Sequence, residues 1–228
     1  MKLNILSWNI WFDGHFDAVA SFLEKSDADI IGLQEVVPND SSRDTIGFLS
    51  QRGYNHVAAP VLMIDRDGRI MANAIFSKHK ILHAKTHNLS DTNTRNALQA
   101  DIQAGNRLLH VFTTHLFHTH QKPSEIQDEQ ARNLLKVLPR ERVILMGDFN
   151  ATPKSDTIKK MKEMLLDTDP SEQPTWSVYP EGCPTCNPQK IDTRLDYIFV
   201  SKDLQAGGCS VGKSKGSDHL PISVTVEV

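Results

Sequence analysis

The sequence predicts an α+β protein in which layered sheets are covered by helices. Eight short apolar runs are typical of strands, and three segments with helical spacing lie between them. No internal repeat, low-complexity tract or glycine/serine linker divides the 228 residues, so we expect one domain over residues 1–228. A hydrophobic content of 39% and a charged content of 23% are typical of a folded globular chain.

The predicted strands are short apolar runs of the length that strands usually have. The last one, ISVTVEV, alternates strictly between apolar and polar residues and indicates a strand buried on one face. The runs are Leu3–Trp8, Ile30–Leu33, Asn73–Ser77, Ala97–Ile102, Leu108–Thr114, Val143–Met146, Leu195–Val200 and Ile222–Val228.

Three helices are expected between these strands. Residues 16–23 place apolar side chains at helical spacing. The segment SEIQDEQARNLLKVLP begins with the capping-box pattern of Ser124 and Gln127, and Pro139 ends it. Ser155 is expected to cap a third helix, whose apolar positions also have helical spacing.

Charge, hydropathy and cysteine content exclude several classes of protein. A net charge of -3 argues against a protein that grips long nucleic acid through broad phosphate neutralisation. No run approaches the roughly 20 apolar residues of a membrane span. The start, MKLNILSWNIWF, lacks the apolar core of a secretory signal, although a signal removed earlier stays an alternative. Three cysteines are no disulfide framework, which favours a reducing compartment, the cytoplasm or the nucleus.

Polar side chains recur where the predicted strands begin or end. Burying a carboxylate or amide without a partner inside a strand costs several kcal/mol, whereas ligand sites collect at strand ends. We therefore expect these residues to converge on one site. They are Asn9, Glu35, His115, Asp148, Asn150, Asp196, Asp218 and His219.

The residue types in this set indicate metal-assisted hydrolysis. Carboxylates and amides without a cysteine suit a hard cation, Mg²⁺ or Mn²⁺. Further carboxylates can activate water, and a histidine held by an aspartate can stabilise charge on a phosphate oxygen. The sequence thus predicts hydrolysis of a phosphate ester.

Six ordered segments resemble a known family. LSWNI, LQEV, TTHL, GDFNATP, RLDYIFVS and GSDHLPI are similar to the motifs of the endonuclease/exonuclease/phosphatase superfamily, to which deoxyribonuclease I belongs. The resemblance runs from residue 3 to residue 228. It implies a four-layer α/β/β/α sandwich, with helices outside two packed mixed sheets, and an Mg²⁺- or Mn²⁺-dependent phosphodiesterase.

The resemblance also implies a role for each motif residue on the metal side of the site. Glu35 would be the main metal ligand, helped by Asn9 and Asp218. Asp148 would position or deprotonate the attacking water. Which group acts as the general base is left open.

On the phosphate side, the resemblance implies that Asn150 binds the scissile phosphate and that His219, oriented by Asp196, stabilises the transition state. His115 would be a second phosphate contact or an acid. From the residues alone, Asp196 has an alternative partner in Arg194, which lies two residues away on the same face of a strand.

The substrate is predicted less narrowly than the reaction. TRNALQADI, PTW and RLDYIF resemble in order the 5′-tyrosyl-DNA phosphodiesterases, but small bacterial-type phosphodiesterases fit equally. His118 and Thr152 replace a serine and an arginine that contact substrate in the tyrosyl branch, which argues against its specificity. We expect a monomer acting on a compact phosphodiester, such as a DNA end or a phosphotyrosyl-DNA adduct.

Two alternatives to this substrate are kept. One is a phosphoinositide phosphatase or sphingomyelinase-like lipid phosphohydrolase, and the other is an inactive binding module of the same fold. An inactive module would be expected to have lost motif residues that this chain retains. Trp176, Lys213 and Lys215 are candidate substrate-binding residues, as an aromatic wall and an anion clamp at the rim. The alternatives are a core position for Trp176 and an ordinary solvated loop for the two lysines.

Cys183 and Cys186 have the Cys-x-x-Cys spacing of half a zinc site. No second such pair exists, and although histidines could complete a site, a turn with two surface thiols is the favoured interpretation. Strand alternation would point His115 away from the histidines at positions 110, 118 and 120, which are expected at the surface or beside the substrate.

Overall fold

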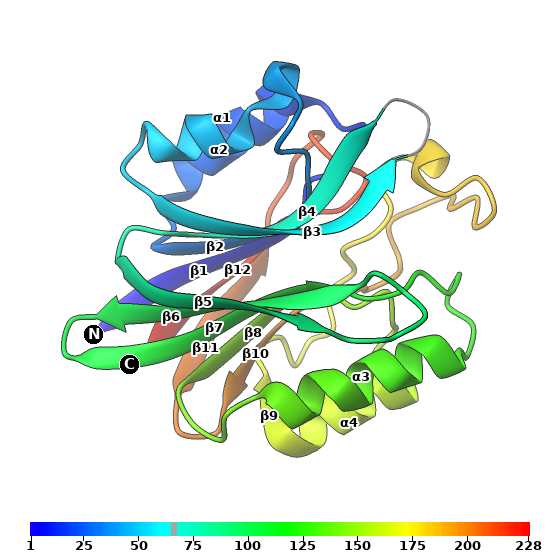
Figure 1. Cartoon of the computed structure of the whole chain (residues 1–228). Helices are drawn as coiled ribbons and strands as arrows, with labels where there is room; N and C mark the ends of the chain where they lie inside the picture. The colour runs from blue at the N-terminus through cyan, green and yellow to red at the C-terminus, as the bar shows by residue number, and fades with distance from the viewer. Residues whose placement is uncertain (65–67) are drawn as a thin grey trace.

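The computed structural model of the protein describes residues 1–64 and 68–228. In this part of the chain, two mixed sheets of six strands pack face to face, with helices on the outer face of each (Figure 1). This confirms the predicted α+β fold and its four layers. In the described residues, no helix is both long and apolar enough to cross a membrane.

The first sheet has the strand order β11-β12-β1-β2-β4-β3. Strands β1 and β2 are parallel, and the other neighbours in this sheet are antiparallel. The strands span Lys2–Asn9 (β1), Ile30–Val36 (β2), Asn55–Ile64 (β3), Arg69–Ser77 (β4), Gln205–Val211 (β11) and Ile222–Glu227 (β12).

The second sheet has the strand order β5-β6-β7-β8-β10-β9. Its parallel pair is β7 and β8, and its other neighbours are antiparallel. The strands span Lys80–Asn88 (β5), Asn96–Ala104 (β6), Arg107–His115 (β7), Val143–Asp148 (β8), Leu165–Asp167 (β9) and Asp196–Ser201 (β10).

Helices α1 (Phe16–Ser26) and α2 (Thr45–Ser50) cover the first sheet, and α3 (Glu125–Val137) and α4 (Asp156–Met164) cover the second (Figure 1). Two short 3₁₀ turns complete the elements, η1 (Ser41–Arg43) and η2 (Pro180–Gly182).

The predicted caps of α3 and α4 are present. The Ser124 hydroxyl accepts a hydrogen bond from Gln127 N at 3.4 Å, and the Ser155 hydroxyl accepts one from Ile158 N at 3.3 Å. The Gln127 side chain does not complete the capping box. Its amide instead donates to the carbonyl oxygens of Phe117 and Asn150, at 2.9 and 3.0 Å, and so ties α3 to two loops of the site described below.

Three apolar layers separate the four structural layers. The central one joins the sheets, with Ile5 and Ile75 from the first and Val111 and Ile144 from the second. One outer layer packs the first sheet against α1 and α2, and the other packs the second sheet against α3 and α4. Close-packed protein interiors resist deformation, so these layers fix the two sheets relative to each other.

All eight predicted strands are present, and the four that the sequence did not indicate are β3, β5, β9 and β11. These four are the edge strands of the two sheets. An edge strand is covered less completely than a central one, and most side chains of β5 and β11 are exposed. Their apolar signal is therefore weak.

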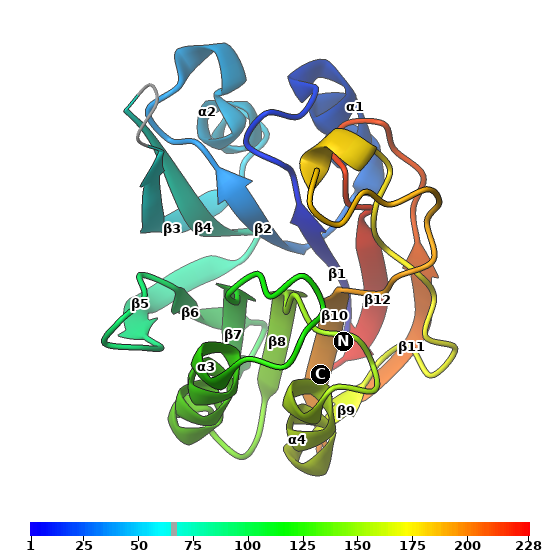
Figure 2. The same ribbon diagram turned by 90° about the vertical axis from the view of Figure 1, so that its right-hand side faces the viewer.

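The two parallel pairs bring four strand ends to one edge of the molecule. Strands β1 and β2 of the first sheet and β7 and β8 of the second all run toward the side that faces the viewer in Figure 2. The antiparallel β10 begins at that edge, since Asp196 is the register partner of Asp148. The topology thus gathers the polar residues that the sequence places at strand ends.

Candidate active site

Asp148 is the last residue of β8, and it lies where β8 passes very close to β7. Its register partner on the parallel β7 is His115. The preceding residue, Gly147, has a φ of +145°, and a Cβ there would collide with the carbonyl oxygen of Thr114. A glycine is required at this position because only its missing side chain allows the approach. This explains why a buried strand finishes with Gly147 before its carboxylate.

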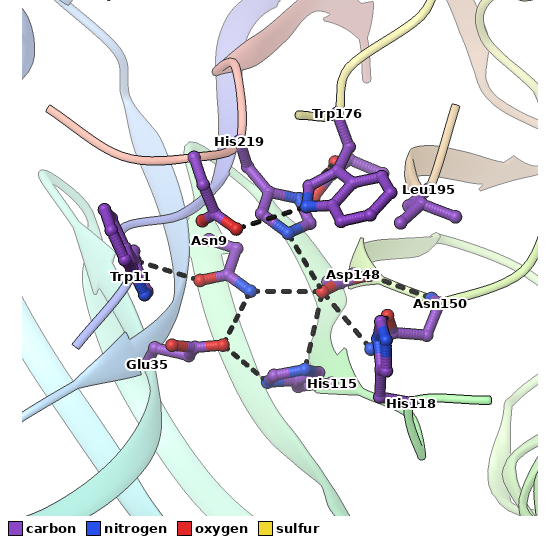
Figure 3. Close-up of polar contacts among 12 residues, drawn as sticks. Asn9, Trp11, Glu35, His115, His118, Asp148, Asn150, Trp176, Leu195 and His219 are labelled. Carbon is purple, nitrogen blue, oxygen red and sulfur yellow. Dashed lines mark hydrogen bonds and ion pairs between the residues drawn. The ribbon is translucent and has the colours of Figure 1, made fainter. Parts of the chain in front are cut away.

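Polar side chains and a backbone N–H group surround the buried Asp148 carboxylate (Figure 3). Asn9 Nδ2 donates to Asp148 Oδ2 at 3.1 Å. The same oxygen lies 3.4 Å from His115 Nε2 and 3.7 Å from His219 Nε2. The other oxygen, Oδ1, accepts a hydrogen bond from Asn150 N at 2.8 Å. The carboxylate is therefore the centre of the network.

Burial and neighbouring charges perturb three titratable groups here. Burial raises the pKa of Asp148, and the Asp196 carboxylate adds to this. Burial alone would lower the pKa of His219, but the carboxylates of Asp196, Asp148 and Asp218 outweigh it and raise that pKa well above its usual value. Burial, with the positive charge of Arg95, lowers the pKa of His115 well below its usual value. Near neutral pH these shifts favour the cationic form of His219 and the neutral form of His115.

Asp196 contacts His219 and not Arg194. Asp196 Oδ2 lies 2.8 Å from His219 Nδ1 and accepts a hydrogen bond from Thr175 Oγ1 at 2.6 Å. Arg194 pairs with Asp167 instead, with Nη2 2.7 Å from Oδ1. The structure therefore decides between the two partners that the sequence left open for Asp196.

The predicted metal ligands also line this site. Glu35 Oε1 accepts from Asn9 Nδ2 at 3.0 Å, and Glu35 Oε2 accepts from Phe12 N at 3.1 Å. Asp218 Oδ2 accepts a hydrogen bond from the indole nitrogen of Trp176 at 3.1 Å. Burial and the nearby Asp218 charge raise the pKa of Glu35.

This donor set fits a hard divalent cation. Across residues 1–64 and 68–228, neither Glu35 nor Asp218 forms an ion pair with a lysine or arginine. Two close carboxylates without such a counter-charge are the oxygen ligands that Mg²⁺ and Mn²⁺ prefer. Three buried groups, Asp148, Asp196 and His219, also lie close enough to hold an ion. His219 already lies between the two carboxylates, 2.8 Å from Asp196 and 3.7 Å from Asp148.

Six of the eight predicted site residues line a pocket of about 300 Å³, and Asn9 and Asp196 lie behind them. Trp11 and Arg95, which the sequence reasoning missed, also line it. Arg95 Nη1 is buried and has no hydrogen-bond partner in the described part of the chain. Arg95 immediately precedes β6, whose antiparallel pairing with β7 brings its start to the pocket edge. The signal that could have found Arg95 is its place in TRNALQADI, just before a predicted strand.

The candidate substrate residues differ in their position relative to the pocket. Trp176 lines the pocket but is only 4% exposed, and its ring supports Asp218, so it does not form an open aromatic wall. Lys213 and Lys215 are exposed and are not among the residues that line the pocket. Their role as an anion clamp stays a prediction.

The histidines after β7 do not follow strand alternation, because β7 ends at His115. His110 remains on the strand, 2.8 Å from Asp101. His118 instead turns toward the pocket, with Nδ1 2.7 Å from Asn150 Oδ1 (Figure 3). The interpretation of two surface thiols is wrong for Cys183, which is buried and lies beside His118.

Comparison with known proteins agrees with this geometry. The sequence profile of the Endonuclease/Exonuclease/phosphatase family matches residues 6–219. No curated protein sequence gave a significant match.

Three solved structures illustrate the similarity of fold. An endonuclease/exonuclease/phosphatase from Beutenbergia cavernae superposes with a TM-score of 0.82 at 20% identity, over 100% of this chain and 72% of the other. ANGEL2, a 2′,3′-cyclic phosphatase, gives 0.75 at 17% identity, over 99% and 95%. A humanized TDP2 from D. rerio gives 0.69 at 20% identity, over 100% and 99%. At these identities the similarity establishes the deoxyribonuclease I-like fold.

Proposed function

Since the chain belongs to the Endonuclease/Exonuclease/phosphatase family, whose members are hydrolases acting on phosphate esters, we propose that it is a divalent-metal-dependent phosphodiesterase. The observation that carries the proposal is the Asp148 network. A buried carboxylate that lines the pocket contacts the Asn9 amide, the backbone N–H of Asn150 and two histidines. Such a set can activate water and stabilise charge on a phosphate, as hydrolysis requires.

Asp148 is proposed to position the attacking water and take its proton. Burial raises the pKa of this carboxylate, which increases its affinity for a proton. The hydrogen bonds from Asn9 and from the backbone of Asn150 hold both of its oxygens in place. Because the carboxylate is already held in position, it needs to reorient less during the reaction.

The phosphate side is assigned to Asn150, His115, His219 and Arg95. His219, kept cationic by Asp196, would stabilise negative charge in the transition state. His115 is neutral by the same reasoning, so we assign it as a phosphate contact and not as the acid. Arg95 is added because a guanidinium with an unpartnered buried nitrogen suits a phosphate oxygen.

Glu35 and Asp218 are proposed to hold a Mg²⁺ or Mn²⁺ ion, with Asn9 beside them. When bound, this ion would polarise the phosphate and offset the charge of the leaving oxygen. In the structure Asn9 donates to both Glu35 and Asp148, so it also links the ligand to the proposed base.

A compact phosphodiester is the proposed substrate. The pocket is small, at about 300 Å³, and the chain carries a net charge of -3, so long nucleic acid would find little phosphate neutralisation. DNA ends, a 5′-phosphotyrosyl end and small diesters fit this requirement. The similarity of fold to ANGEL2, a 2′,3′-cyclic phosphatase, adds a 2′,3′-cyclic phosphate as a further candidate.

A panel of substrates tests the proposal. It should contain a 5′-phosphotyrosyl oligonucleotide, a 2′,3′-cyclic phosphate end, single-stranded DNA, supercoiled plasmid, phosphoinositide and sphingomyelin. We expect Mg²⁺-dependent turnover of an end or small diester, and none by Asp148→Asn. Efficient nicking of plasmid without activity on ends would indicate a deoxyribonuclease-like endonuclease. Turnover of the lipids alone would support the lipid phosphohydrolase alternative, and no turnover of any substrate would support a binding module.

A further inference from the structure

Four nitrogen and sulfur side chains meet beside the pocket, and we propose that they bind a zinc ion. His118 and His120 come from the loop that follows β7, and Cys183 and Cys186 come from the turn that follows η2. We call them the Cys/His cluster. Their ligand atoms all lie within 4.8 Å of one another. The two loops are far apart in the sequence and meet only through the fold.

The distances between these atoms are close to those of a tetrahedral zinc site. With Zn–N bonds of about 2.0–2.1 Å and Zn–S bonds of about 2.3 Å, neighbouring ligand atoms should lie about 3.3–3.8 Å apart. His118 Nε2 lies 3.6 Å from the sulfur of Cys183 and 3.6 Å from that of Cys186. His120 Nδ1 lies 3.5 and 3.2 Å from the same sulfurs, and the two nitrogens are 3.0 Å apart. The distances of 3.5 and 3.6 Å fall inside this range, and those of 3.2 and 3.0 Å lie just below it, so the set approximates the required tetrahedron.

Hydrogen bonding fixes which nitrogen of His118 is available to a metal. Asn150 Nδ2 donates to the carbonyl oxygen of Leu116 at 3.1 Å, so Asn150 Oδ1 is the acceptor for His118 Nδ1 at 2.7 Å. His118 therefore carries its proton on Nδ1, and the lone pair of Nε2 points at the two sulfurs. Ligating histidines commonly donate their other N–H to an oxygen in this way.

The cysteine turn is also shaped as a metal-binding turn. The backbone N–H of Cys186 lies 3.2 Å from Cys183 Sγ, where it would stabilise a thiolate. Asn187 N donates to the carbonyl oxygen of Cys183 at 2.9 Å and closes the turn. Both cysteines are free thiols, and Cys183 is buried. Thiolate and imidazole ligands select zinc over Mg²⁺, so this site differs chemically from the one at Glu35.

A zinc ion here would fix one wall of the pocket. Gly182, Cys183, Pro184 and Thr185 line the pocket, and the ion would tie this turn to the loop after β7. It would also hold His118 against Asn150. This consequence for the pocket rests on the proposed function, whereas metal binding by the Cys/His cluster does not.

Measuring the metal content tests the proposal directly and needs no substrate. The intact protein and three variants are loaded with Zn²⁺, desalted and analysed by mass spectrometry for zinc per chain. The variants are Cys183→Ser/Cys186→Ser, the thiol control Cys209→Ser, and Glu35→Gln as a control for zinc at the other site. We expect about one zinc per chain in the intact protein and both controls, and almost none in the double variant.

Cobalt substitution keeps the test decisive if the double variant does not fold. Co²⁺ bound to the intact protein should give the intense visible bands of tetrahedral cobalt and a thiolate-to-cobalt charge-transfer band, and Zn²⁺ should abolish both. No zinc in the loaded protein, undiminished zinc in the folded double variant, or cobalt bound without the thiolate band would overturn the proposal. A Cys183–Cys186 disulfide in protein purified under reducing conditions would also overturn it. Since none of these readouts uses catalysis, an error in the proposed reaction would leave them unchanged.

Discussion

Two polar clusters border the same pocket, and they differ in the donor atoms they offer. The acidic cluster, formed by Asn9, Glu35, Asp148, Asp218 and His219, presents mainly oxygen atoms. The Cys/His cluster presents two imidazoles and two thiols. Oxygen ligands suit a hard ion that keeps open positions for water and substrate, whereas four nitrogen and sulfur ligands suit a closed structural ion. The difference indicates chemistry at the first and support at the second.

The clusters also differ in how the chain builds them. The acidic cluster is assembled from the ends of strands in both sheets, which the apolar layers hold in place. The Cys/His cluster is assembled from two loops. Asn150 links them, because its Oδ1 lies 2.7 Å from His118 Nδ1 and its backbone N–H donates to Asp148 Oδ1 at 2.8 Å. Support from the loops can thus reach the phosphate side of the pocket.

The largest expected effect is the loss of hydrolysis when the metal of the acidic cluster is removed. Treatment with EDTA should abolish hydrolysis, and Mg²⁺ or Mn²⁺ should restore it, because the acidic cluster supplies oxygen ligands. Glu35→Gln should raise the Mg²⁺ concentration for half-maximal activity by about tenfold or more. The Cys183→Ser/Cys186→Ser variant is the matched control and should keep the intact protein's Mg²⁺ dependence. Full activity in metal-free buffer would contradict the assignment.

The next effect concerns the centre of the acidic cluster. Asp148→Asn should lower kcat by about 10²-fold or more, because the amide can neither take a proton nor keep the negative charge that His219 faces. Zinc content and the far-ultraviolet circular dichroism should not change, since this residue lies at a strand end. Near-normal turnover would show that Asp148 has been given the wrong role.

A smaller effect is expected where Asp196 acts through another residue. Asp196→Asn should lower kcat by on the order of tenfold, less than His219→Ala, because it removes the charge that keeps His219 protonated and oriented. The double variant should lose less than the sum of the two single losses in free energy, if the pair acts as a unit. Strict additivity would mean that the two residues act independently.

The smallest effect is expected outside both clusters. Lys213→Ala/Lys215→Ala should raise KM by about two- to fivefold and leave kcat almost unchanged, as expected for exposed charges that bind ground state and transition state alike. Arg95→Ala, inside the pocket, is the comparison and should also lower kcat. If the lysine variant reduced kcat as much as Arg95→Ala did, these lysines would have to reach the reacting phosphate.

Much of the acidic cluster was predictable because its signals are local. A strand shows itself by its apolar run, and the residue at its end is read directly from the sequence, as for Asn9 at the end of β1 and Asp148 at the end of β8. Arg95 was missed although it also flanks a strand, because only the pairing of β6 with β7 brings it to the pocket. The edge strands were missed because their exposed side chains weaken the same apolar signal.

The sequence by itself determined the fold class, the central strands, the caps of α3 and α4 and the polar residues at strand ends. These depend on the periodicity of burial and on backbone chemistry within a few residues. Only the tertiary structure decided that Asp196 faces His219 and not Arg194, that Trp176 supports Asp218, and that His118 and His120 meet Cys183 and Cys186. These contacts join segments that lie far apart in the sequence. The sequence separation of two such segments does not say whether they meet in space. They are fixed by sheet packing and by where each loop leaves its last strand.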